Sequence, residues 1–150
     1  MLAVRPSTSK DVTYLAPRLR YDDLRELLAA GSASAEAALS DGLEHSRQCL
    51  TIHDEQDNAV AMFGVVPAGD PVGYVWLLGS DQIQFNKTQF LRHSRIELEK
   101  LQHEFPLLTN CVDARNMVHI AWLRWLGFKF LRQVTPGHLP FYEFARISNV

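Results

Sequence analysis

The chain has only two cysteines among its 150 residues, Cys49 and Cys111, and no C-x-x-C pair. One possible pair cannot build the disulfide framework of a small secreted domain. Both cysteines lie in apolar runs, which favours reduced core thiols in a reducing compartment. The chain also lacks an apolar run of the roughly 18 residues that a membrane span needs, and its first residues lack the apolar core of a secretion signal. We expect a soluble protein that is not secreted and has no membrane partner.

An excess of charge of either sign is missing too. The 15 basic and 17 acidic side chains leave a formal net charge of −2. No global attraction to nucleic acid is therefore encoded. The pairs Arg18/Arg20 and Arg92/Arg95 have acidic residues nearby in the sequence, and we expect both pairs to lie on solvated faces. Nucleic acid is not an expected partner.

Several catalytic signatures are absent. The 6 histidines form neither H-x-H nor H-E-x-x-H, so no metal site is expected. The sequence has no G-x-S-x-G nucleophile elbow, no Walker A loop and no constellation of paired carboxylates. Trp122 and Trp125 lie three positions apart on one helix face, where packing explains them better than ligand binding.

What the sequence does contain is a mixed pattern of helices and strands in one domain that spans residues 1–150. With 47% apolar residues, a chain of this length can bury a sizeable core. Ser7 or Ser9 is expected to cap the first helix, with Asp11 in its first turn. Further helices are expected at 21–30, 34–45 and 85–105, with another from Asn116 onward, and strands at 2–5, 48–53, 59–66, 72–78, 107–112, 128–134 and 141–147.

The segment at 112–130 is the most informative part of the chain. It runs V-D-A-R-N-M-V-H-I-A-W-L-R-W-L-G-F-K-F, from an apolar strand through an apolar-rich helix to a second strand. Asn116 opens the helix, and Gly127 and Phe128 follow 11 and 12 residues later. Asn116 is either a helix N-cap, where its replacement would cost about 1 kcal/mol, or a residue that faces a ligand.

This segment, the order of the elements and the opening V4-R-P-S-T-S-K-D11 together resemble the GCN5-related N-acetyltransferase (GNAT) fold. The resemblance covers 4–147 and implies an α/β (α+β) domain with a mixed, mostly antiparallel central sheet and flanking helices. A narrower similarity links S80-D-Q82, N116-x-x-H119-I120 and F141-Y-E-F to small GNAT-like phage proteins of the internal virion protein A type. It implies a role in virion assembly or in support of internal ejection proteins, with other virion proteins as partners. The host cytoplasm and the virion would then be its locations.

The GNAT resemblance also implies how acetyl-CoA would bind. The residues in question would be Leu77, Leu78, Gly79, Ser80, Gln82 and Asn116. The family places a glycine-rich turn at the end of this strand, where backbone N–H groups cradle the diphosphate. Here G79-S-D-Q-I-Q-F-N-K-T-Q89 has no glycine after Gly79. Asp81 would also repel the anionic diphosphate by roughly 3 kcal/mol at about 5 Å and an effective dielectric of ~20.

The family's proton donor is absent as well. A tyrosine that often lies seven residues after the asparagine is replaced by Leu123. His119 and Tyr142 are the candidates for proton transfer, although a histidine on a helix face and a packed strand tyrosine with its hydroxyl outward explain them better. We therefore expect a degenerate, non-catalytic GNAT scaffold with no bound cofactor. Two alternatives stay open: an N-acetyltransferase with a divergent CoA loop, and a homo-oligomer that pairs through a strand edge near 141–144.

Overall fold

The computed structural model describes residues 1–148. The elements follow one another along the chain as a strand, helices, a three-strand meander, two helices, a strand, a helix and two further strands. The strands are β1 (Ala3–Pro6), β2 (Gln48–His53), β3 (Ala59–Pro67), β4 (Val72–Gly79), β5 (Leu107–Asp113), β6 (Lys129–Val134) and β7 (Phe141–Ile147). The helices are α1 (Ser9–Leu15), the 3-10 turn η1 (Ala16–Arg18), α2 (Tyr21–Ala29), α3 (Ala35–His45), α4 (Gln82–Phe85), α5 (Lys87–Glu104) and α6 (Met117–Trp125).

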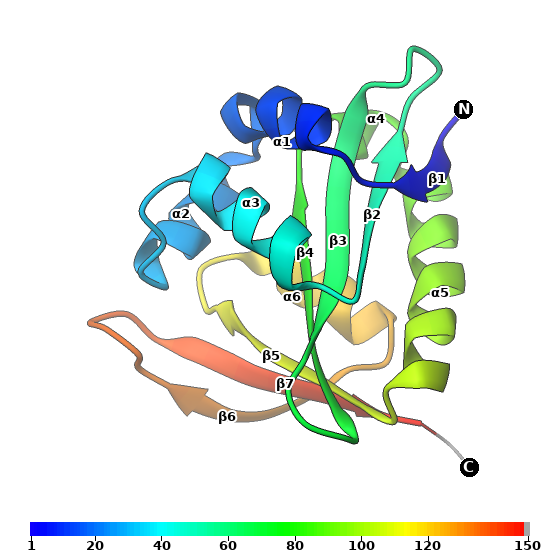
Figure 1. The fold of residues 1–150 in the computed structure, drawn as a ribbon. Coiled ribbons are helices and arrows are strands. Elements are labelled where there is room, and N and C mark those ends of the chain that lie inside the picture. Colours follow the sequence, from blue (N-terminus) through cyan, green and yellow to red (C-terminus); the bar gives the residue numbers. More distant parts are fainter. Residues whose placement is uncertain (149–150) are drawn as a thin grey trace.

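All seven strands join one sheet in the order β1-β2-β3-β4-β5-β7-β6. Every neighbouring pair is antiparallel except β4 and β5, which run parallel. That parallel pair is short, since only 72–74 pair with 107–109. Figure 1 shows the remaining parts of β4 and β5 running apart from this junction. The mixed, mostly antiparallel sheet with flanking helices that the sequence predicts is confirmed.

Helices cover both faces of the sheet (Figure 1). On one face, α1 and α3 bury Val12, Leu15 and Leu39 against Met62 of β3. On the other face, α5 and α6 bury a larger cluster. That cluster includes alternate residues of several strands, because successive side chains of a strand point to opposite faces of the sheet. The sheet is thus the middle layer of three, and the gap between β4 and β5 opens through it.

The long helix expected at 85–105 is found as α5, which begins two residues later than expected and is preceded by the short helix α4, which the sequence did not predict. α4 ends at Phe85, and Asn86 leaves the helical region with φ −129° and ψ 35°. The carbonyl of Asn86 then accepts the N–H of Phe90 at 2.9 Å and so begins α5. A hydrophobic period cannot reveal this break, because one non-helical residue barely shifts the register of the apolar side chains.

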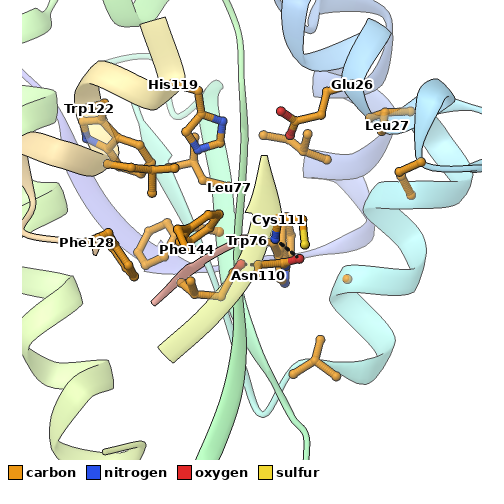
Figure 2. Close-up of a pocket in the computed structure, with 18 of the residues that line it drawn as sticks. Glu26, Leu27, Trp76, Leu77, Asn110, Cys111, His119, Trp122, Phe128 and Phe144 are labelled. Atoms are coloured by element: carbon orange, nitrogen blue, oxygen red, sulfur yellow. Dashed lines mark hydrogen bonds between the residues drawn. The ribbon is translucent and has the colours of Figure 1, made fainter. Parts of the chain in front are cut away.

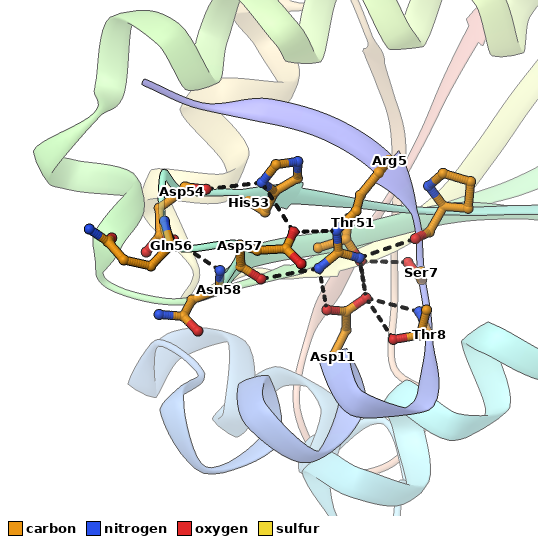
Figure 3. A network of polar contacts seen from close by, with 11 residues as sticks. Arg5, Ser7, Thr8, Asp11, Thr51, His53, Asp54, Gln56, Asp57 and Asn58 are labelled. Atoms are coloured by element: carbon orange, nitrogen blue, oxygen red, sulfur yellow. Dashed lines mark hydrogen bonds and ion pairs between the residues drawn. The ribbon is translucent and has the colours of Figure 1, made fainter.

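The expected cap of the first helix is also wrong by one residue. Thr8, not Ser7 or Ser9, is the N-cap of α1, and its N–H donates to Asp11 Oδ2 at 2.9 Å. Figure 3 shows the reason, because Asp11 is held by Arg5 of β1. Arg5 donates to both carboxylate oxygens at 2.8 and 2.9 Å, and its Nε donates to Asp57 Oδ1 at 2.7 Å. This arginine joins the first strand, the first helix and the β2–β3 turn.

Two further expectations need correction. The segment at 141–144 is no free strand edge, because β7 pairs with β5 on one side and β6 on the other. Arg20 does not lie on a solvated face, since only 9% of it is exposed and it pairs with Asp23 at 2.9 Å. Within 1–148, no helix is both long enough and apolar enough to cross a membrane.

Candidate active site between strands β4 and β5

The divergence of β4 and β5 opens a cavity of about 500 Å³. Strand residues Val75, Leu77 and Cys111 line it, with α2 and α3 on one side of the sheet and α6 on the other. Asn110 keeps the strands joined at the base of the gap, because its Nδ2 donates to the carbonyl of Val75 at 2.9 Å. Within β5, Thr109 to Cys111 are only half-buried because they border this gap.

Glu26 of α2 places a carboxylate on the wall of this cavity. Its Oε1 accepts the N–H of Asp113 at 2.8 Å and Nδ2 of Asn116 at 3.3 Å. The pKa of Glu26 is raised to about 7, mainly by burial and also by the neighbouring Asp23, although these two hydrogen bonds act in the opposite sense. Near neutral pH, Glu26 therefore exchanges a proton readily.

Asn116 is the centre of a buried polar network and not a side-chain cap. Its side chain makes no capping hydrogen bond to α6. It is 1% exposed, and its Nδ2 donates to Asp23 Oδ1 at 3.1 Å as well as to Glu26. The side chain thus ties α6 to α2 across the end of the sheet. Asn116 does occupy the N-cap position of α6, as the sequence predicts, and its carbonyl accepts the N–H of Ile120 at 3.0 Å, but its side chain does not cap the helix.

His119 lies on the opposite wall from Glu26, as Figure 2 shows. Burial lowers the pKa of His119, so the ring is neutral at pH 7. Its Nδ1 is buried without a hydrogen-bond partner among the described residues. The ring packs at a tilt of 47° against Trp122, with the ring centroids 5.1 Å apart, and the centroid of Trp122 in turn lies 5.7 Å from that of Phe90. Trp122 therefore packs as expected, whereas Trp125 is 43% exposed beneath Arg95.

The other proposed site residues are distributed over two places. Leu77 and Leu78 line the cavity together with His119. Tyr142 is on β7, where its ring meets that of Phe130 edge-on at 6.3 Å, outside the cavity lining. Leu123 is 2% exposed and lines the cavity. The position that the GNAT resemblance gives to a tyrosine therefore presents only an apolar side chain to the cavity.

Gly79, Ser80 and Gln82 lie at the end of β4, where the protein itself uses their polar groups. The N–H of Gly79 donates to Asp23 Oδ2 at 3.0 Å, and its carbonyl accepts the N–H of Arg20 at 2.8 Å. Ser80 Oγ donates to the carbonyl of Val60 at 2.9 Å and accepts the N–H of Gln82 at 3.3 Å. Few backbone donors remain here for an external anion.

The turn after β4 does not fit a diphosphate. Asp81 is exposed at the start of α4, a helix of only four residues. Ile83 packs so closely against Gly79 that a Cβ there would clash with its side chain. Lys87, the basic residue nearest in sequence, is exposed in the next helix. The end of β4 is therefore poorly suited to hold a diphosphate.

The sequence interpretation missed Asp23 and Glu26. The apolar side chains Tyr21 and Leu28 of α2 are 71% and 47% exposed, whereas Asp23 is 1% exposed. The signal was the helical spacing that puts Asp23 and Glu26 beside Leu27, the buried leucine of α2. Two carboxylates next to a buried apolar position indicate an interior polar site.

Comparison with solved structures identifies the architecture. The ribosomal-protein-S18-alanine N-acetyltransferase of Escherichia coli is 19% identical, with a TM-score of 0.67 over 100% of this chain and 96% of that chain. A GCN5-related N-acetyltransferase of Kribbella flavida is 16% identical, with a TM-score of 0.69 over 98% of each chain. The ribosomal-protein-alanine N-acetyltransferase of Brucella melitensis is 14% identical, with a TM-score of 0.69 over 97% of this chain and 99% of that chain.

These similarities span essentially the whole chain, so the protein has the GNAT fold. By sequence, the chain matches no family model and no curated protein. At identities below 20% the structural similarity establishes the architecture, while activity has to be argued from the site.

Proposed function

We propose that this protein transfers an acyl group from a thioester, acetyl-CoA or a related acyl-CoA, to an amine. The observation that carries the proposal is Glu26, a carboxylate with a pKa raised to about 7 on the wall of the β4–β5 cavity. A general base works best when its pKa lies near the working pH. The GNAT fold supports the same reaction class, since the similar structures bear the name N-acetyltransferase.

In this reaction the thioester is a substrate, held with its acyl arm between β4 and β5. The amine nitrogen attacks the thioester carbonyl carbon, and Glu26 takes the proton that the nitrogen loses. The carbon–nitrogen bond forms, the carbon–sulfur bond breaks, and the thiolate leaves. Glu26 then returns its proton to the thiolate, directly or through water. A separate acid at the Leu123 position is therefore unnecessary.

Release of free thiol tests the proposal directly. The protein would be mixed with acetyl-CoA or octanoyl-CoA and a panel of amines. The panel would include a peptide with an N-terminal alanine, because two of the similar structures are named for that acceptor. We expect thiol release that depends on the amine, with kcat/KM rising with pH to a plateau above about 7.

Glu26→Gln keeps the acceptor oxygen for Asp113 and Asn116 but cannot take a proton. We expect it to lower kcat/KM at least about a hundredfold, within the usual contribution of a general base. Glu36→Gln is the matched control, because Glu36 is exposed on α3. An unchanged kcat/KM in the Glu26→Gln variant would remove Glu26 from the mechanism. Absence of thiol release with every donor and amine would refute the transfer reaction.

A second candidate is a non-catalytic accessory role in a phage virion, with other virion proteins as partners. It is favoured by the end of β4, where Asp23 and Arg20 occupy the backbone groups of Gly79. A protein without a catalytic role could lose the phosphate-binding turn and still function. The motifs at 80–82, 116–120 and 141–144 motivate the virion assignment.

Mass spectrometry of purified virions from a phage that encodes this chain tests that role. Copies of the chain in the particle, together with no heat of binding for acetyl-CoA or octanoyl-CoA, would support the scaffold. Low-micromolar binding of either thioester would count against a purely structural role.

A further inference from the structure

We infer that the β4–β5 cavity selects a medium-chain acyl group of about eight carbons, and that the acyl chain rather than the nucleotide supplies most of the affinity for the donor. The inference rests on the proposed transfer reaction and names the acyl group that it would carry. Three features of the site support it: the size of the cavity, the distribution of polar groups in it, and the shortage of free backbone donors at the end of β4.

The cavity is far larger than an acetyl group needs. An apolar protein cavity of about 150 Å³ is enough to bind benzene, a molecule with six carbons. The β4–β5 cavity measures about 500 Å³. Its volume therefore admits a chain several times longer than the two carbons of acetyl.

The cavity has a pair of titratable groups and a separate pair of aromatic rings on its wall. Glu26 and His119 face each other at one end, where the thioester carbonyl and the amine would meet (Figure 2). Phe128 and Phe144 lie at a different part of the wall, as Figure 2 also shows, and their rings pack edge-on at 5.1 Å. Both rings are at most 4% exposed. A chain directed toward these rings would leave water for a mostly apolar part of the wall, which Asn110 also borders.

The β4 terminus offers little binding energy to a nucleotide. The backbone groups of Gly79 are occupied by Asp23 and Arg20, and Asp81 is an exposed negative charge at the same turn. An acyl-CoA recognised here must therefore bind mainly through its acyl end. Burial of one methylene improves binding about fourfold, so an added six-carbon segment compensates for a missing phosphate cradle.

Calorimetric titration with a short series of ligands tests this inference. The ligands are acetyl-CoA, octanoyl-CoA, S-octanoyl pantetheine and CoA itself. We expect octanoyl-CoA to bind at least about a hundredfold more tightly than acetyl-CoA. S-octanoyl pantetheine should bind within about tenfold of octanoyl-CoA, although it lacks the diphosphate. Equal affinity for acetyl-CoA and octanoyl-CoA would overturn the chain preference, and loss of binding by the pantetheine ester would overturn the minor role of the nucleotide.

A filled cavity gives the second test. Leu77→Trp places a larger side chain on the cavity wall, and we expect it to reduce the preference for octanoyl over acetyl at least tenfold. Leu131→Trp is the matched control, since Leu131 is 58% exposed on β6 and outside the lining. Far-ultraviolet circular dichroism would verify that each variant folds. If Leu77→Trp does not fold, Cys111→Phe fills the same wall. If a folded variant with the filled cavity keeps the full preference for octanoyl-CoA, the acyl chain must bind elsewhere, and the inference is refuted.

These outcomes separate the inference from the proposed function. Tight octanoyl-CoA binding without thiol release to any amine would leave the acyl pocket standing and refute the transfer. Thiol release from acetyl-CoA and octanoyl-CoA with equal kcat/KM would leave the transfer standing and refute the chain preference.

Discussion

The side-chain amide of Asn116 donates to Asp23 Oδ1 across 3.1 Å and so joins residues 93 positions apart in the chain. The same Nδ2 also reaches Glu26. Asp23 in turn accepts from Arg20 and from the N–H of Gly79. One buried amide thus connects α6, α2 and the end of β4, and sets the position of the carboxylate that we propose as the base.

Replacement of Asn116 should destabilise the fold through this network. Removal of the Nδ2 donor leaves two carboxylates underpaired in the interior, a loss of about 1–3 kcal/mol. We expect Asn116→Ala to lower the free energy of unfolding in urea by that amount. Asn116→Asp should cost more, because it adds a negative charge next to Asp23 and Glu26.

Asn116→Ser distinguishes the network from a helix cap. Serine is as good an N-cap as asparagine, but its hydroxyl is too short to bridge Asp23 and Glu26. We expect Asn116→Ser to be about as unstable as Asn116→Ala. Recovery of wild-type stability by serine would show that the helix start, and not the network, is what Asn116 supports.

Stability should depend on pH through Glu26. Its folded pKa, about 7, lies above the ordinary glutamate value of 4.5. The folded protein therefore binds the proton more tightly, and the contribution of Glu26 is lost as pH rises from about 4.5 to 7. His119 acts oppositely near its ordinary pKa, because burial lowers its pKa. Asp11 and Asp113, whose pKa values are lowered, act only in more acidic solution.

The Glu26→Gln variant isolates this effect, because the other groups are common to both proteins. Its free energy of unfolding relative to wild type should increase by up to about 3 kcal/mol between pH 4.5 and 7. Urea unfolding of both proteins across this range measures the difference. A constant difference would mean that Glu26 titrates at its ordinary pKa.

Gly42 should resist replacement although it lies inside helix α3. Alanine normally stabilises a helix interior by about 1 kcal/mol relative to glycine. A Cβ at Gly42 would, however, lie 2.8 Å from Cη2 of Trp76. Overpacking of this kind costs about 1–3 kcal/mol, so we expect Gly42→Ala to lower the melting temperature. In a Trp76→Leu background the same change should become neutral or stabilising, and additive effects would exclude the clash.

The stability that the Arg5 network contributes should depend strongly on Asp11 and hardly on Asp57. The Asp11 side chain is 5% exposed, whereas that of Asp57 is 68% exposed. Exposed ion pairs contribute about 0–1 kcal/mol, while a buried charge-assisted hydrogen bond contributes about 1.5–3 kcal/mol. We therefore expect Asp11→Asn to lower the free energy of unfolding by about 2 kcal/mol. Asp57→Asn is the matched control, since asparagine tolerates the φ of +64° at this position.

In urea unfolding, this control should lie within about 0.5 kcal/mol of wild type. If the two substitutions lower the free energy of unfolding equally, burial does not determine how much each ion pair contributes.

Local signals predicted most of the fold. Period-two apolar runs located all seven strands within a few residues, and Ser34 caps α3 as an N-cap serine should. Gly31 ends the α2 segment with φ +99°, the left-handed conformation that glycine adopts without strain. Boundaries failed where one residue changed the backbone, as at Asn86. The assignment of Arg20 to solvent failed because its partner, Asp23, is itself buried.

By itself, the sequence determined the order of elements, the antiparallel meander and the apolar segment from Asn116 to Phe128, because these depend on contacts between residues close in the chain. It also determined that the turn after Gly79 lacks further glycine and that Leu123 cannot donate a proton. Only the tertiary structure decided the site. Asp23 and Glu26 acquire their burial and their shared amide from α6 and β5, about 90 residues away, and it is burial that raises the pKa of Glu26. The divergence of β4 and β5, which opens the cavity, likewise depends on how the two strands pair, and the sequence of neither strand reveals it.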